Sequence, residues 1–158
     1  MATDGKVEML RHALATLAYR GERATGGTPA EFAEFAGGVR TPDQILAHIG
    51  DLLDWALSMA NGAEHWHEAR RPLPWDHAIA RFFAGLEALD RRLASPEPLR
   101  APAERLFQGP IADALTHVGQ LAMLRRLAGC PQHGENYFVA DIAIGRVGPE
   151  QAAPRKTC

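Results

Sequence analysis

Apolar residues recur along this chain at intervals of three and four positions, which is the spacing of one face of an α-helix. Glycines stand where the first and last stripes stop, at Gly21 and Gly129. A capping box is expected at the second stripe, where Thr41 and Pro42 are followed by Gln44. The pattern predicts four helices, over about residues 6–20, 42–60, 75–93 and 110–128.

Strand signals are scarce, because Val, Ile and Thr are few while Ala and Leu are abundant. Four amphipathic helices with polar connections predict an all-α fold, a four-helix bundle. The long connection between the first two helices allows a crossover, so these helices need not be antiparallel neighbours. A single domain over residues 1–158 is expected. Its core is about 5–130, and its C-terminal extension, 131–158, has a short helix near 137–144.

Composition narrows the functional classes. The chain of 158 residues has 17 basic and 19 acidic side chains, so the basic excess of a nucleic-acid-binding protein is missing. No stretch approaches the roughly 18 apolar residues of a membrane span, and no signal peptide is indicated. Two cysteines are too few for a disulfide framework, so we expect a cytoplasmic protein with reduced thiols. Three arginine pairs on helices or at helix ends are expected to form solvated faces: Arg70-Arg71, Arg91-Arg92 and Arg125-Arg126.

Polar residues stand on two of the apolar stripes. His48 lies on the stripe of the second helix, three residues after Ile45 and four before Leu52. Asp113 and His117 are four residues apart, so they share one face of the last helix. A buried carboxylate is costly without a partner, and a divalent metal ion would supply one. Two histidines and one carboxylate are typical of a catalytic zinc site, which keeps a fourth position for water or substrate.

Simpler interpretations stay open on spacing alone. Asp113 and His117 would also suit an exposed helical pair, and a lone histidine such as His48 is more often a hydrogen-bonded core residue. Residues 61–72 are expected to form a polar connector, and His65 and His67 within it fit a solvated loop better than a second metal site.

The sequence also predicts roles for three residues close to these candidate ligands. Asp51, one turn from His48, is a candidate general base. Gln120 is a candidate for supporting a metal ligand, but hydrogen bonding on the helix face is its expected role. Gly119 is expected to mark the close approach of a neighbouring helix.

Two segments resemble the DinB-like superfamily of metal-binding four-helix bundles. The first, residues 40–56, reads RTPDQILAHIGDLLDWA and is similar to that family's second helix, whose histidine is the first metal ligand. The second, residues 114–129, reads ALTHVGQLAMLRRLAG and is similar to its last helix. The resemblance covers about residues 5–130. It makes His48 the first ligand and His117 the last, and Asp113 occupies the position of the family's middle histidine.

The resemblance also carries functional expectations. It implies a divalent metal, zinc or nickel, and a low-molecular-weight thiol as cofactor. The activity would be that of a thiol-S-transferase, isomerase or hydrolase acting on a small-molecule substrate, in a homodimer. An acidic residue also fills the Asp113 position in related mycothiol-dependent members. The alternative hypothesis is a non-catalytic, stress-related binding or dimerisation module whose metal site is structural or vestigial.

Overall fold

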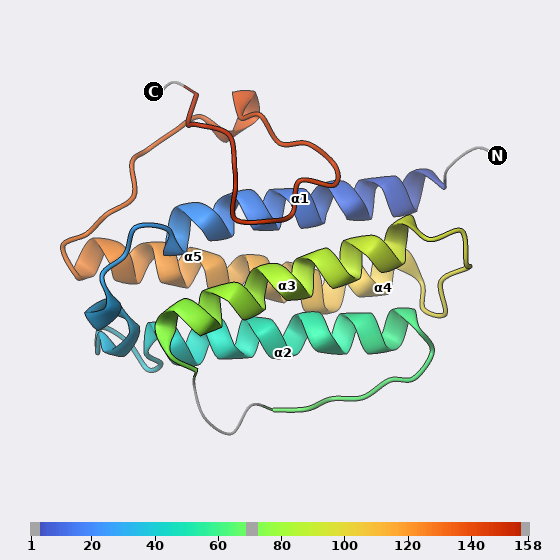
Figure 1. Ribbon diagram of the computed structural model, residues 1–158, viewed down its shortest axis with the longest axis horizontal. Coiled ribbons are helices and arrows are strands. Elements are labelled where there is room, and N and C mark those ends of the chain that lie inside the picture. Colours follow the sequence, from blue (N-terminus) through green and yellow to red (C-terminus); the bar gives the residue numbers. More distant parts are fainter. Residues whose placement is uncertain (1–3, 69–72, 156–158) are drawn as a thin grey trace.

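Helices account for the regular structure of this protein, and no strand occurs in residues 4–68 and 73–155, which the computed structural model describes (Figure 1). The predicted all-α class and four-helix arrangement are confirmed at this level. No helix in these residues is both long enough and apolar enough to cross a membrane. The four long helices are α1 (Gly5–Thr25), α2 (Pro42–Ala60), α3 (Trp75–Ala94) and α5 (Ala112–Leu127).

The helices pack in the cyclic order α1, α3, α2, α5, which leaves α1 and α2 at diagonal corners. The α2 and α3 helices run parallel, because Arg81 lies beside Gly50 and Arg92 bonds to the end of α2 at Ala60. The α1 helix runs antiparallel to α3, since Arg11 pairs with Asp90 near opposite ends of the two helices.

This order requires two long connections. Residues 26–41 cross from α1 to the diagonal α2 and include the 3₁₀ turn η1 (Ala30–Glu34), whose Phe32 is buried. After α2, residues 61–68 run back along this helix (Figure 1), in the direction that a parallel neighbour such as α3 requires. The start of α2 has the predicted capping box, in which the Gln44 side chain accepts from the Thr41 amide at 3.1 Å.

Two predictions that rested on glycines are wrong: the end of the first helix at Gly21 and the close packing at Gly119. The α1 helix does not end at Gly21 but continues to Thr25. A Cβ on Gly21 would lie 2.4 Å from the Phe82 ring, so this glycine permits close packing against α3. The close approach expected at Gly119 is wrong, because a Cβ there would meet nothing within 4 Å.

The last helix begins earlier than predicted. A short helix, α4 (Ala103–Leu106), leads into α5 through a π-helical turn, Phe107–Ile111. Pro110 lies inside this turn and is not the first helical residue. Proline lacks the amide hydrogen that a regular α-helix uses, and a π-turn is one way to accommodate that interruption.

The C-terminal extension packs back over α1 (Figure 1). Its Glu135 accepts hydrogen bonds from Tyr19 and Arg23, and its Val147 is buried in the core. The short helix expected near 137–144 is reduced to one 3₁₀ turn, η3 (Tyr137–Val139). Tertiary bonds to α1, more than helix propensity, hold this segment.

Two arginines expected on solvated faces bind helix ends instead. Arg125 is buried and donates to the carbonyl oxygens of Arg23, Gly26 and Cys130. Carbonyls at the end of a helix have no partner within it, so these bonds satisfy them. Arg92 does the same for α2. The pair Arg70-Arg71 lies outside the described residues.

The two cysteines differ in the same way. Cys130 is a free thiol, and Cys158 lies outside the described residues.

The two glycines predict opposite effects of the same substitution. Gly119→Ala should raise the free energy of unfolding by about 0.5–1 kcal/mol, because alanine favours an exposed helix interior. Gly21→Ala should lower it by about 1–3 kcal/mol, because the Phe82 ring must move. Urea unfolding followed by circular dichroism measures both. Equal effects of the two variants would contradict the packing described at Gly21.

Candidate metal centre

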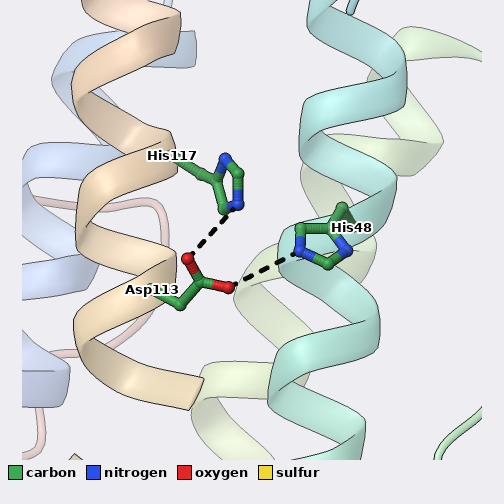
Figure 2. A group of neighbouring side chains, drawn as sticks. All are labelled: His48, Asp113 and His117. Atoms are coloured by element: carbon green, nitrogen blue, oxygen red, sulfur yellow. Dashed lines mark ion pairs between the residues drawn. The ribbon is translucent and has the colours of Figure 1, made fainter. Parts of the chain in front are cut away.

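The three predicted ligands meet between α2 and α5 (Figure 2). His48 Nε2 lies 3.6 Å from one carboxylate oxygen of Asp113, and His117 Nε2 lies 3.5 Å from the other. One ligand atom from each residue lies within 4.8 Å of the other two. Among the described residues, this is the one group of three or more histidine, cysteine or acidic side chains with such spacing.

The separations suit a shared ion better than direct hydrogen bonds. Good N–H···O bonds are about 2.7–3.2 Å long, and both imidazole–carboxylate distances exceed that range. Two ligands about 2.05 Å from a tetrahedral ion would lie about 3.3 Å apart. The two histidine–carboxylate distances are close to this value but go to different oxygens of Asp113, and the three ligand atoms lie within 4.8 Å of one another, so small side-chain movements would bring them onto a common ion.

Core packing places each ligand. On α2, buried Ile45, Ile49 and Leu52 fix the face from which His48 projects toward α5. On α5, buried Ala114 and Val118 flank the Asp113–His117 pair in the same way. The π-helical turn ends just before this pair, and such turns are frequent at functional sites.

Burial differs among the three ligands. The side chains of His48 and His117 are 22% and 13% exposed, but that of Asp113 is 47% exposed. The sequence argument from a costly buried carboxylate is therefore wrong, because solvent reaches Asp113. The candidate metal site therefore rests on the relative positions of the three side chains.

The protein favours the neutral, metal-binding form of His48. Burial lowers the pKa of His48 below its ordinary value, and the nearby charges of His117 and Arg40 lower it further. The carboxylate of Asp113 acts in the opposite direction but does not reverse the shift. Histidine binds a metal only when its ligating nitrogen is unprotonated, so this environment is compatible with a ligand role for His48.

Gln120 orients the second histidine. Its Oε1 lies 2.8 Å from Nδ1 of His117. Because an amide oxygen only accepts, Nδ1 carries the proton and Nε2 presents its lone pair toward Asp113. Metal-binding histidines almost always have such a partner on the other ring nitrogen. The sequence predicted hydrogen bonding on the helix face for Gln120. In the structure this bond is donated by His117 and accepted by the Gln120 amide oxygen.

Trp66 belongs to the surroundings of the centre, although the sequence indicated only a polar connector over 61–72. Its ring meets His48 edge-to-face, with centroids 6.0 Å apart, and meets Trp55 in the same way at 5.7 Å. Glu64, in the same connector, accepts a hydrogen bond from the Trp55 indole at 3.3 Å. A tryptophan in an otherwise polar connector was the signal available in the sequence.

Other predicted candidates lie apart from the centre. Asp51 is buried and accepts from Arg81 of α3 at 2.8 Å, so it is held on a different face of α2 from His48. We therefore do not retain it as the general base. His65 and His67 are exposed, and their rings stack on each other with centroids 6.3 Å apart.

The centre faces space on two sides. One cavity, of about 480 Å³, is lined by both histidines and Gln120, and another, of about 420 Å³, by Asp113 and Trp55. An ion with three protein ligands has a position left for water or a substrate atom.

Comparison with protein-family models, curated proteins and solved structures finds no match for this chain.

The lowered pKa of His48 predicts a pH-dependent stability of the metal-free protein. Below about pH 6.5, the unfolded chain binds a proton at this histidine more readily than the folded chain does. The free energy of unfolding should therefore decrease as the pH falls through that value. Urea unfolding between pH 7.5 and 5.5 measures the slope, which should be smaller in His48→Gln. The same slope in both proteins would contradict the proposed environment of His48.

Proposed function

We propose that this chain binds one divalent metal ion through His48, Asp113 and His117 and uses it as an enzyme acting on a small molecule. The observation that carries the proposal is the spacing of the three ligand atoms beside two cavities. The reaction class is that of a thiol-S-transferase, isomerase or hydrolase. Its nucleophile would be a thiol or water at the remaining coordination position.

A bound divalent ion supplies nucleophile activation, because it lowers the pKa of a thiol or water that it coordinates. The chain contributes two neutral imidazoles and one carboxylate, which offsets part of the ion's charge. The Asp113 carboxylate would therefore leave the bound nucleophile less acidic than a third histidine would. Gln120 keeps His117 in the ligating tautomer.

Imidazole and carboxylate donors suit several divalent transition metals, zinc and nickel among them. The choice of zinc or nickel rests on the same resemblance to DinB-like proteins as the choice of thiol. The choice of a low-molecular-weight thiol is supported by the resemblance of residues 40–56 and 114–129 to DinB-like proteins. We include membership of that superfamily, and a cytoplasmic location, in the proposal.

A non-catalytic module with a structural metal is the competing proposal. Structural zinc sites almost always have four protein ligands, whereas this cluster, among the described residues, has three. The adjoining cavities also favour a centre that meets a ligand. A homodimer is compatible with either proposal. It is supported by an apolar hollow between α1 and α4, at which Met9 and Phe107 are exposed.

Metal content tests the centre. Protein expressed without a histidine tag and reconstituted with zinc or nickel should hold a stoichiometric ion, measured by mass spectrometry. His48→Ala and His117→Ala should abolish this binding, because each removes one of three ligands. His65→Ala, which removes an exposed histidine outside the cluster, should bind as the unchanged protein does.

Gln120→Leu provides a graded variant in the same experiment. It keeps every ligand but removes the partner of His117, so the affinity should fall by about 10- to 100-fold. A protein that binds no stoichiometric metal after reconstitution would exclude the centre.

The proposed enzymatic activity can be tested by measuring the rates of thiol reactions. The metal-loaded protein should accelerate the reaction of at least one low-molecular-weight thiol with an electrophile, and Asp113→Asn should change that rate. The metal-free protein is the control for uncatalysed thiol reactivity. No acceleration with any thiol in a broad panel would exclude the transferase, and a parallel panel of hydrolysable esters and amides tests the hydrolase.

A further inference from the structure

The larger cavity beside the centre combines an apolar wall with a polar edge. Its volume of about 480 Å³ lies within the range of small-molecule sites. The polar edge consists of the two histidines, Arg40 and Gln120.

The polar edge presents hydrogen-bond donors and positive charge. Arg40 is exposed and forms no ion pair or hydrogen bond with any residue in the parts of the chain that the structure describes. Gln120 uses its amide oxygen for His117, so its NH₂ group is left to donate. No carboxylate lines this cavity; Asp113 lines the other one. A divalent ion on the three ligands would add further positive charge.

The apolar wall of the cavity leaves large hydrophobic side chains in contact with solvent. Val39, Met123 and Leu127 are all largely exposed, although each is a large apolar side chain. They lie around one hollow, so a single ligand could remove part of each from water. Burial of apolar surface contributes roughly 25 cal/mol per Å². The lining therefore favours a ligand that has both a hydrocarbon segment and an anionic group.

We infer that this cavity binds an amphipathic carboxylate, with its carboxylate at Arg40 and Gln120 and its hydrocarbon segment against Val39, Met123 and Leu127. This ligand class deepens the proposed function and rests on it, because the acid would be the substrate or thiol presented to the metal. The cavity contacts His48 and His117 directly, so a ligand held there lies beside the coordination position.

The binding itself can be measured on metal-free protein. Hexanoate and hexanamide share a hydrocarbon chain but differ in charge, and each can be titrated into ¹⁵N-labelled protein and followed by NMR. Hexanoate should bind roughly threefold more tightly, in the range expected for an exposed ion pair. The largest shifts should occur at the amides of Gly37 and Gly38, which line the cavity.

Arginine variants separate this site from general attraction of anions. Arg40→Gln should make the affinities for the two ligands equal. Arg91→Gln, a change at an exposed arginine of α3, should preserve the preference for hexanoate.

Three outcomes would overturn the inference. They are equal binding of the two ligands by the unchanged protein, loss of the preference in both arginine variants, or shifts confined to the hollow at Met9 and Phe107. Because no metal is present, each would leave the metal proposal standing. A protein that binds hexanoate as expected but takes up no metal would instead exclude the proposed enzyme.

Discussion

The packing of α2 against α5 is the constraint on which the candidate centre depends. His48 comes from one helix, and Asp113 and His117 come from the other. A shift of one residue along a helix moves a side chain by about 1.5 Å along the axis and about 100° around it. Such a shift would take His48 out of reach of the other two. Buried Ile49 and Leu121 help to hold the required register.

The α2 helix is held on its other side by a charged contact. Arg81 of α3 donates to Asp51 at 2.8 Å and to Asp54 at 2.7 Å, and its guanidinium lies beside Gly50, where a Cβ would clash with it. Asp51 and His48 are three residues apart, yet they serve different interfaces. One fixes α2 to α3, and the other projects toward α5.

The order of the helices also explains what surrounds the centre. Placing α1 and α2 at diagonal corners requires the connection 26–41, whose end supplies Arg40 to the cavity. Placing α2 parallel to α3 requires a connection that returns along α2, and this one brings Trp66 to His48. Both connections that the topology makes long therefore contribute side chains beside the same three ligands.

The sequence by itself determined the helical segments and the candidate ligands. Periodicity, the capping residues Thr41 and Gln44 and the four-residue spacing of Asp113 and His117 are local features, and local geometry expresses them directly. For His48, local pattern predicted only that it lies on the apolar stripe of its helix, and not that this stripe faces α5. The tertiary structure decided the rest.

What the tertiary structure decided was which distant groups meet. Gly21 and Gly119 are indistinguishable by residue type, but only Gly21 faces an aromatic ring on another helix. The exposure of Asp113 and the burial of Arg125 likewise depend on neighbours far away in the chain. Local sequence fixes which side chains share a face of a helix, whereas packing between helices fixes what that face meets.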